Sequence, residues 1–370
     1  MRGLEQAFRT LGYKVETLTQ QADIENVAKN LQKEGVVGLF SFDYVPCLGE
    51  VCIQNGKKYI SWVVDWPHSH IYAKSARHKD VYIFIFDRTG YFEALDRGLE
   101  NVYYLPLATD WEYFSEVLDK VSESEKHKFQ CEVSFMGNLY DARENNLYDR
   151  IEYLPPLLQG YLEGLMSAQR KVWGYTFLRE AIRQEMWEVI RRYIQWDLGD
   201  KYDDVYEELI EGMLCKKIAQ MERKEMCSLL ANQFDFSLYT KSDTSFDNNI
   251  QNKGAVDYFK KMPILFRYSK ININITLHSI KSGIPLRCLD VMACQGFLLS
   301  NYQSELAEYF EDGEEIVLWH DFEDLQNKIV YYLNHEEERK QIAEAGYRKV
   351  KENFSYDFLV GQMMKCVMQE

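Results

Sequence analysis

Short apolar runs alternate with amphipathic stretches along most of the chain, a pattern typical of buried parallel strands that are covered by helices. The runs that predict strands are Val36–Phe42, Tyr59–Val64, Val81–Phe86, Val102–Leu105, Glu132–Met136, Phe236–Thr240, Phe266–Asn274, Phe297–Ser300 and Glu315–Trp319. The stretches between them carry apolar residues every three or four positions, as helices do. This order predicts an α/β protein with doubly wound, Rossmann-like sheets.

The first residues depart from this pattern. Met1–Gly12 predicts an amphipathic helix, and Lys14–Leu18 predicts a strand after it. A doubly wound domain normally opens with a strand in the middle of its sheet. That place would lie between Lys14–Leu18 and Tyr59–Val64. We therefore expect either a short apolar strand and a polar loop upstream of Met1 in the natural protein, or an unusual N-terminal sheet. With the place vacant, the N-terminal domain should be the less stable one.

The middle of the chain predicts the division into domains. Ser122–Lys128 is charged and has no apolar period, so we predict the domain linker there. Residues 146–233 are almost wholly helical in pattern and predict an insertion packed on the C-terminal domain, with solvated charged faces. The predicted domains are 1–124, 125–355 with this insertion, and a terminal helix over 356–370. Shorter predicted features are a turn at Pro46–Glu50 and a helix at Val256–Met262.

Composition limits the partners of the protein. A chain of 370 residues with 46% hydrophobic and 27% charged residues is typical of a globular protein with two domains. The net charge is −15 without a basic block, which argues against nucleic acid or an anionic membrane as the main partner. No run approaches the ~18–20 apolar residues of a membrane span and no signal peptide opens the chain, so we expect a cytoplasmic protein. The eight cysteines contain no CxxC pair and no metal-ligand spacing, which predicts reduced thiols and no metal site.

Two charges stand near the beginning of one predicted helix. The Gly283–Pro285 turn precedes this helix, and Arg287 and Asp290 are three residues apart on one of its faces. The positive end of a helix and a planar guanidinium suit phosphate oxygens, and a carboxylate one turn later suits a ribose diol. The alternative is a surface ion pair worth only about 0.2–0.5 kcal/mol.

Other candidates follow predicted strands, where open α/β sheets bind ligands. Gly137 and Asn138 end one strand, and a glycine there lets backbone N–H groups approach a diphosphate, with Arg143 within reach. Asn272 and Asn274 point to one side of an extended segment. They either hydrogen-bond the phosphate or sugar of a ligand or cap the adjacent turn.

Asp65 and His68 follow a predicted inner strand of the N-terminal domain. Either side chain can take a proton from a hydroxyl group, and a His–Asp pair tunes such a base toward neutrality. The alternative is that Asp65 caps the following turn while His68 lies on the surface.

Several motifs carry a family resemblance. The C-terminal half contains SKININIT (269–276), GIPLRCLDVMACQGFLLSNY (283–302), ELAEYFEDGEEIVLW (305–319) and HEEERKQIAEAGYRKVKENFSY (335–356). Upstream lie YISWVVDWP (59–67), NVYYLPLATD (101–110) and VSFMGNLYD (133–141). Together these segments, which span nearly the whole chain, resemble the CgeB-like glycosyltransferases of the GT-B superfamily.

This resemblance implies two Rossmann-like domains that face each other across a cleft, with a nucleotide-sugar on the C-terminal domain and the acceptor on the N-terminal domain. It also implies that Tyr356–Met368 crosses back over the N-terminal domain and that no metal is needed. The donor-binding residues assigned on this basis are Gly137, Asn138, Arg143, Asn274, Arg287, Asp290 and Glu305. Retaining members often carry two acidic residues eight positions apart. Asp290 matches the second and Ser282 replaces the first, which leaves the stereochemical outcome open.

We therefore predict a glycosyltransferase of the hexosyltransferase type, with Asp65 and His68 as candidate catalytic residues. It would use a UDP-, GDP- or dTDP-linked sugar as co-substrate, with no cofactor, and an unidentified protein, glycan or small molecule as acceptor. Two alternatives stay open. One is a non-catalytic interaction module that binds through the helical insertion, and the other is an epimerase that acts on the nucleotide-sugar itself.

Overall fold

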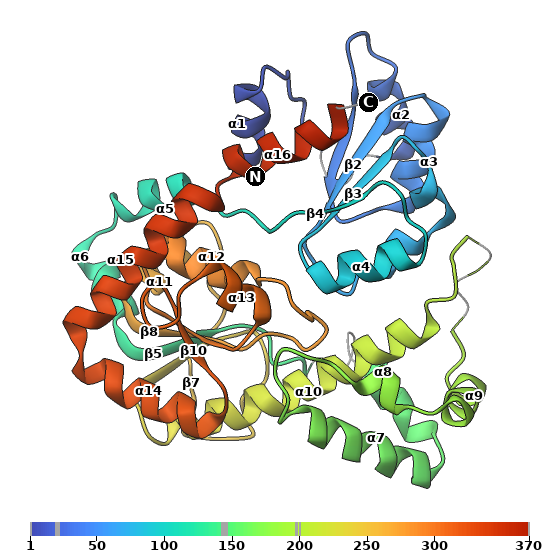
Figure 1. The fold of residues 1–370 in the computed structure, drawn as a ribbon. Helices are drawn as coiled ribbons and strands as arrows, with labels where there is room; N and C mark the ends of the chain where they lie inside the picture. The colour runs from blue at the N-terminus through green and yellow to red at the C-terminus, as the bar shows by residue number, and fades with distance from the viewer. Residues whose placement is uncertain (1, 19–22, 142–146, 197–198, 200, 369–370) are drawn as a thin grey trace. The chain divides into compact units, whose positions relative to one another are not determined.

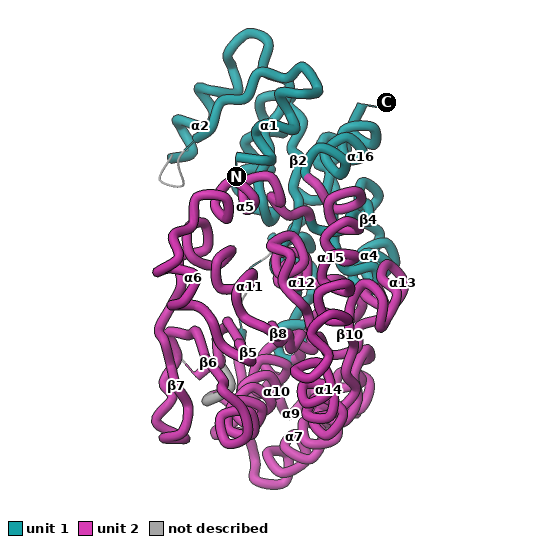
Figure 2. The backbone as a smooth tube through the Cα atoms, turned by 90° about the vertical axis from the view of Figure 1, so that its left-hand side faces the viewer, with its two compact units in different colours: residues 1–107, 196–210, 356–370 teal, residues 108–195, 211–355 magenta. Residues whose placement is uncertain are grey.

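The computed structural model describes residues 2–18, 23–141, 147–196, 199 and 201–368. These residues form two compact units (Figure 2). Unit 1 comprises Met1–Leu107, Trp196–Ile210 and Tyr356–Glu370, and unit 2 comprises Ala108–Gln195 and Glu211–Ser355. Within the described ranges, every helix is too short or too polar to cross a membrane.

Unit 1 is built on a parallel sheet in the order β1-β2-β3-β4 (Figure 1). Its strands are β1 (Gly38–Phe42), β2 (Lys58–Val63), β3 (Val81–Ile85) and β4 (Val102–Tyr104). Its helices are α1 (Arg2–Thr10), α2 (Ile24–Leu31), α3 (Pro46–Gln54), η1 (Ser69–Tyr72), η2 (Lys74–Arg77), α4 (Arg88–Asp96) and α16 (Tyr356–Met368). The four strands predicted for this part of the chain and the first helix are confirmed.

The two faces of this sheet are covered by different parts of the chain. Because the strands follow one another in sequence order, right-handed crossovers place α3 and α4 on one face. On the other face α1 packs against α16 (Figure 1). There Phe40 of β1 meets Phe8 at 5.5 Å between ring centroids, and Trp62 of β2 meets Tyr356 at 6.2 Å. These ring contacts thus join both ends of the chain to one sheet.

The strand predicted at Lys14–Leu18 is wrong, because the described residues 13–18 contain no strand. Only two of the five residues in Lys14–Leu18 are apolar, too few for a strand that is buried on both faces. Glu16 instead forms a surface ion pair with Lys33 at 2.7 Å. The vacant place expected beside Tyr59–Val64 is also absent from the described sheet, since β2 pairs with β1 on one side and with β3 on the other.

Three shorter predictions are wrong for local reasons. Pro46 begins α3 and not a turn, because proline is tolerated in the first turn of a helix. The predicted linker Ser122–Lys128 forms α6 (Glu123–Phe129), whose capping box joins Ser122 and Glu125. The helix predicted at Val256–Met262 lies further along as α11 (Met262–Tyr268), again with proline in its first turn.

Unit 2 contains a parallel sheet in the order β10-β9-β8-β5-β6-β7. Its strands are β5 (Cys131–Met136), β6 (Phe236–Tyr239), β7 (Gln251–Asn252), β8 (Ser269–Asn274), β9 (Leu298–Asn301) and β10 (Val317–Trp319). Its other helices are α5 (Trp111–Leu118), η4 (Leu147–Tyr153), α7 (Pro156–Gln169), α8 (Leu178–Ala181), α9 (Gln184–Tyr193), α10 (Tyr206–Ala231), α12 (Leu286–Ala293), α13 (Ser304–Tyr309), α14 (Phe322–Asn334) and α15 (Glu336–Asn353). This is the Rossmann strand order, in which the chain starts in the middle and later continues on the other side of its first strand. The switch point therefore lies between β5 and β8.

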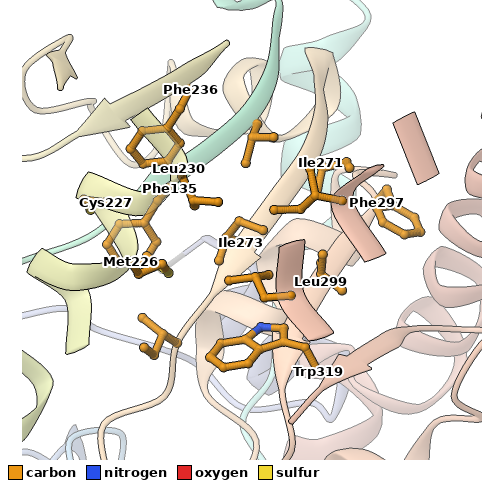
Figure 3. Close-up of a cluster of buried hydrophobic side chains, with 14 of the residues drawn as sticks. Phe135, Met226, Cys227, Leu230, Phe236, Ile271, Ile273, Phe297, Leu299 and Trp319 are labelled. Atoms are coloured by element: carbon orange, nitrogen blue, oxygen red, sulfur yellow. The ribbon is translucent and has the colours of Figure 1, made fainter. Parts of the chain in front are cut away.

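The main apolar core of unit 2 lies against this sheet (Figure 3). It includes Phe135, Ile271, Ile273, Leu299 and Trp319 from the strands and Met226, Cys227 and Leu230 from α10. All of these side chains are buried. Burial of its apolar side holds α10 beside the central strands, which fixes the position of its polar residues as well.

The helical insertion between β5 and β6 contributes residues to both units. Residues Trp196–Ile210 belong to unit 1, so the boundary between the units falls within α10. The N–H of Lys74 donates to the carbonyl oxygen of Lys201 at 2.9 Å, and the N–H of Asp203 donates to that of Tyr72 at 3.1 Å. The insertion is predicted to pack on the C-terminal domain, and Trp196–Ile210 depart from this prediction because they belong to unit 1.

Candidate functional site

The candidate site of unit 2 lies where the carboxyl ends of β5 and β8 meet at the switch point. In open α/β sheets the crevice outside this point is the usual ligand site. Gly137 and Asn138 follow β5, and Ile275 and Thr276 follow β8.

Arg223 of α10 joins these two strand ends. Its Nη1 donates to the carbonyl oxygen of Asn138 at 2.6 Å, and its Nη2 donates to that of Ile275 at 2.8 Å. The guanidinium lies 5.5 Å from the ring centroid of Phe135 and 4.9 Å from that of Tyr140. Arg223 is 9% exposed, and its Nε has no hydrogen-bond partner in the described structure. A positive charge is thereby fixed at the switch point.

The charged residues of the insertion are predicted to lie on solvated faces, and buried Arg223 is an exception to this prediction. Its two carbonyl partners lie 85 and 52 positions away in the sequence. No local signal marks such a contact, because it depends on the position of α10 against the sheet.

Gly137 and Asn138 have structural reasons for their identity. A Cβ atom at Gly137 would lie 2.9 Å from the ring of Phe135, so a side chain there requires that ring to move. The N–H of Gly137 donates to the carbonyl oxygen of Tyr239 at 3.1 Å, which continues the pairing with β6. The Oδ1 of Asn138 accepts from the N–H of Tyr140 at 2.6 Å, and Tyr140 has a left-handed backbone with φ of 56°. Arg143 lies outside the described residues.

Arg287 is the second residue of α12 and is half-buried. Among the described residues, no hydrogen bond or ion pair ties its guanidinium to another side chain or carbonyl, and it lies 5.8 Å from the ring centroid of Phe266. Burial lowers the pKa of Arg287, while Asp290 raises it and Arg223 lowers it. The guanidinium nevertheless stays charged, because its ordinary pKa lies far above neutrality. It is therefore available to an anionic ligand.

Asp290 is buried, with 1% of its surface exposed, so the alternative of a surface ion pair with Arg287 is wrong. Its Oδ1 accepts from the hydroxyl of Thr109 at 2.8 Å, and its Oδ2 accepts from the hydroxyl of Tyr258 at 2.9 Å. Burial raises the pKa of Asp290 from 3.8 to about 6, and these hydrogen bonds and Arg287 act in the opposite direction. Each carboxylate oxygen retains the capacity for a second hydrogen bond.

The two predicted asparagines of β8 are held by internal hydrogen bonds. The Nδ2 of Asn274 donates to the hydroxyls of Ser300 at 2.9 Å and Thr276 at 3.1 Å, as a residue that organises the adjacent turn does. The Nδ2 of Asn272 donates to the carbonyl oxygen of Phe266 at 2.9 Å. Both side chains are buried, which places Asn272 in the interior of the sheet.

Glu305 lies beside Ser282. The hydroxyl of Ser282 donates to Oε1 of Glu305 at 2.7 Å, and the N–H of Glu305 donates to the carbonyl oxygen of Ser282 at 3.2 Å. Both residues are buried. The carboxylate of Glu305 on α13 therefore lies next to Ser282, the residue that replaces the first of the two acidic residues of retaining members.

Helix α10 also holds the loop after β8 through a buried histidine. The Nε2 of His278 lies 2.9 Å from Oε1 of Glu222, and both side chains are buried. The ring of Trp173 stacks on the imidazole with 4.8 Å between centroids. The other carboxylate oxygen of Glu222 has no hydrogen-bond partner in the part of the chain that the structure covers. Together with Arg223, this pair fixes the switch-point loop to the insertion.

In unit 1, Asp65 and His68 follow β2 at the carboxyl edge of the sheet. Asp65 is exposed, and its N–H donates to Oδ1 of Asp43 at 3.2 Å. The Nε2 of His68 lies 3.0 Å from the backbone nitrogen of Tyr44 and 2.9 Å from its carbonyl oxygen. His68 is half-buried, and the segment after β1 therefore fixes its ring.

Two parallel α/β units, the second with the Rossmann strand order and a cationic switch point, define the GT-B fold of glycosyltransferases. HepE of Anabaena in complex with UDP-glucose has this fold, with a TM-score of 0.51 and 10% identity over 99% of this chain and 89% of HepE. A glycosyltransferase of Rickettsia africae has it too, with a TM-score of 0.50 and 12% identity over 100% of this chain and 94% of that one. The predicted fold class is confirmed.

Sequence similarity leads to the same class of protein. Residues 219–365 match the family described as "Glycosyl transferase-like". A segment of 77 residues is 31% identical to spore protein CgeB of Bacillus subtilis (strain 168). That segment covers 21% of this chain and 23% of the spore protein, less than a quarter of its length.

Proposed function

We propose that the protein is a metal-independent glycosyltransferase that moves a sugar from a nucleotide-sugar bound by unit 2 to an acceptor not yet identified. The observation that carries this proposal is the half-buried guanidinium of Arg287, which has no hydrogen bond or ion pair within the described structure. A partly desolvated charge is costly unless it is paired, so this position favours an anionic ligand. A nucleoside diphosphate supplies such an anion, and the switch point of a Rossmann-like sheet is where it binds.

The predicted donor-binding residues have distinct roles in this proposal. Arg287 binds diphosphate oxygens with its planar donors, and Arg223 adds positive charge at the ends of β5 and β8. Asp290 accepts from the ribose hydroxyls with its remaining lone pairs. Gly137 and Asn138 follow β5 and face the diphosphate. Arg143, outside the described residues, stays a predicted donor-binding residue. Asn274 and Glu305 hold the neighbouring loops by their internal hydrogen bonds.

Charge explains how these residues assist the reaction. The bond between sugar C1 and the phosphate oxygen breaks, a bond between C1 and an acceptor oxygen forms, and a base takes the proton of the acceptor. Negative charge collects on the departing nucleoside diphosphate, and fixed guanidinium groups stabilise it. Because these groups supply the positive charge, we expect transfer to continue in the presence of EDTA.

Two similarities guide the choice of donor. HepE has been solved with UDP and with UDP-glucose, so a UDP-linked hexose is the first donor to test. The segment shared with spore protein CgeB supports the assignment of this chain to the CgeB-like glycosyltransferases.

A thermal-shift screen tests the proposal. UDP, GDP, dTDP and their sugars are added singly, with and without EDTA, and the melting temperature is recorded. Binding to the folded state alone raises stability by about 2.7 kcal/mol at a hundredfold excess over Kd, so one nucleotide class should give a clear increase. If none does, the transferase proposal fails and a non-catalytic interaction module becomes the better hypothesis. Conversion of the donor alone into an isomer, seen by chromatography, would indicate an epimerase.

A further inference from the structure

Three partly exposed aromatic side chains of unit 2 lie where β9 and β10 end. They are Trp173, Tyr302 and His320. We propose that these rings form a binding site for an uncharged saccharide. The inference goes beyond the proposed glycosyl transfer, because binding at this edge of unit 2 requires neither a nucleotide nor unit 1.

Two neighbouring strand ends hold the first pair of rings. Tyr302 directly follows β9, and His320 directly follows β10. The N–H of Tyr302 donates to the carbonyl oxygen of Trp319 at 2.9 Å, so the pairing of the two strands continues past β9. The rings of Tyr302 and His320 are stacked with 5.6 Å between centroids. Because His320 is exposed and Tyr302 is half-buried, this stack presents its imidazole to solvent.

The loop between α7 and α8 brings Trp173 to the same edge of the sheet. Its ring stacks on the imidazole of His278 at 4.8 Å and meets Trp319, a core residue shown in Figure 3, edge-on at 5.2 Å. The next residue, Gly174, lies against Tyr302, since a Cβ atom there would be 3.0 Å from that ring. The loop is therefore fixed beside both strand ends, and half-buried Trp173 lies next to the stacked pair.

The polar atoms of these three rings are available to a ligand. The indole N–H of Trp173, the hydroxyl of Tyr302 and the ring nitrogens of His320 have no hydrogen-bond partner in the described part of the chain. A site that combines aromatic rings with a few polar atoms suits a ligand that has both kinds of surface. A pyranose ring has both, because its C–H groups form an apolar face and its hydroxyls surround that face.

Another exposed pair of rings in unit 2 shows why the unpaired polar atoms matter. His335 stacks on Tyr331 with 3.8 Å between centroids. The Nδ1 of His335, however, lies 2.7 Å from the carbonyl oxygen of Tyr331, and the hydroxyl of Tyr331 donates to Glu338 at 3.0 Å. This pair uses its polar atoms within the protein, so it offers a saccharide fewer hydrogen bonds.

Local charge disfavours an anionic ligand at the Trp173 site. Residues 172–178 and 298–304 contain no charged side chain, and residues 321–324 contain three acidic ones. Nucleic-acid bases also stack on aromatic rings, but a single strand needs a positive groove for its backbone. The site is also separate from the switch point, since β10 lies two strands beyond β8, about 10 Å away at the usual spacing. An uncharged saccharide fits these conditions best.

Isothermal titration of the full chain with maltotetraose, cellotetraose and chitotetraose tests the proposal. We expect at least one of them to bind with a dissociation constant on the order of 1 mM or tighter, and UDP should not change this value. Tryptophan fluorescence should respond to the bound saccharide because Trp173 lies in the site. Trp173→Phe keeps a ring on His278 and should abolish this response. If none of the three saccharides binds the folded wild-type chain, the proposal is wrong.

Three further variants locate the site. Tyr302→Phe removes only the hydroxyl and should weaken saccharide binding about two- to tenfold. His320→Ala removes an exposed ring and should weaken it by a similar factor. His335→Ala is the matched control, because it removes an exposed histidine from the other stack, and its dissociation constant should equal that of wild type. Equal affinity of all three variants would overturn the assignment of these residues.

The remaining outcomes separate this site from the proposed transferase site. Displacement of the saccharide by UDP, together with weaker binding in Arg287→Ala, would place it at the switch point and overturn the proposal. Binding of a uridine decamer but of no saccharide would show that the rings bind bases, which also overturns it. A nucleotide that raises the melting temperature without any saccharide binding leaves the transferase and removes this site. Saccharide binding without a nucleotide response has the opposite meaning.

Discussion

Arg287 and Asp290 lie one turn apart on α12, yet their charges have different surroundings. The guanidinium of Arg287 is half-buried and has no hydrogen-bond partner among the described residues. Both oxygens of the buried carboxylate of Asp290 accept hydrogen bonds from hydroxyl groups. Spacing along a helix cannot distinguish these cases, because Thr109 and Tyr258 come from distant parts of the chain. One charge is thus available to a ligand, and the other is already stabilised by the protein.

For Arg287 this difference predicts a ligand-binding defect with little effect on folding. A hydrogen bond to a charged group contributes about 1.5–3 kcal/mol, so Arg287→Ala should weaken nucleotide binding roughly ten- to a hundredfold. Isothermal titration with the nucleotide found in the thermal-shift screen measures this. Arg267→Ala is the matched control, because Arg267 is exposed in the same unit and donates to the carbonyl oxygen of Gln295 at 3.0 Å. An unchanged dissociation constant for Arg287→Ala would refute the phosphate assignment.

For Asp290 the difference predicts a stability effect that depends on pH. Its pKa is about 6 in the folded state against 3.8 ordinarily, so the folded protein binds this proton more tightly than the unfolded chain. The free energy of unfolding should therefore fall as pH rises from about 4 to about 6. Asp290→Asn removes this term, and it should gain up to about 3 kcal/mol relative to wild type between about pH 4 and pH 7.5. Urea titrations at both pH values test this, and an equal difference at the two would contradict it.

The elements differ in how far local patterns predict them. The apolar runs predict the strands because most of their side chains are buried beneath helices, and β2 and β8 form close to the expected positions. α3 and α6 are missed because their sequences look like a turn and a linker, and only capping and packing make them helical. The role of α10 is missed as well, since a contact between an insertion and two strand ends leaves no periodic signal. The candidate site is therefore predicted where it lies within one motif, as at Arg287, and missed where it joins distant elements, as at Arg223.

Because Arg223 of α10 joins two strand ends, we expect arginine and lysine at position 223 to differ sharply in their effect on stability. Arg223 reaches two carbonyl oxygens with separate nitrogens, and the single ammonium of lysine reaches only one of them. Arg223→Lys leaves a buried carbonyl unpaired, which costs about 1–3 kcal/mol, and should also weaken nucleotide binding. Arg267→Lys, at an exposed position with one such bond, should change stability by less than about 0.5 kcal/mol. Urea denaturation compares the two, and equal stability of both variants would show that Arg223 does not hold the switch point together.

At the scale of the whole molecule, the two sheets differ in topology. In unit 2 the chain continues on both sides of β5 and creates a switch point, whereas in unit 1 the described strands follow one another in a single direction. The sequence predicts a vacant place beside β2, but the structure has β1 there, paired from Gly38 with Lys58 to Phe42 with Trp62. The reason for expecting an unstable N-terminal domain is therefore removed.

Hydrogen exchange tests this difference in the intact protein. β2 is paired on both sides by β1 and β3, as β9 is by β8 and β10. Amides of strands paired on both sides exchange only when a large part of the structure opens. We expect peptides from β2 and β9 to exchange at similar rates, and those from β1, which pairs on one side in the described sheet, to exchange faster than β2. Each factor of ten in rate corresponds to about 1.4 kcal/mol of opening free energy. Exchange of β2 that is more than about a hundredfold faster than that of β9 would contradict this expectation. It would mean that unit 1 opens separately. Pairing on both sides of β2 would then not give the sheet of unit 1 the stability of the sheet in unit 2.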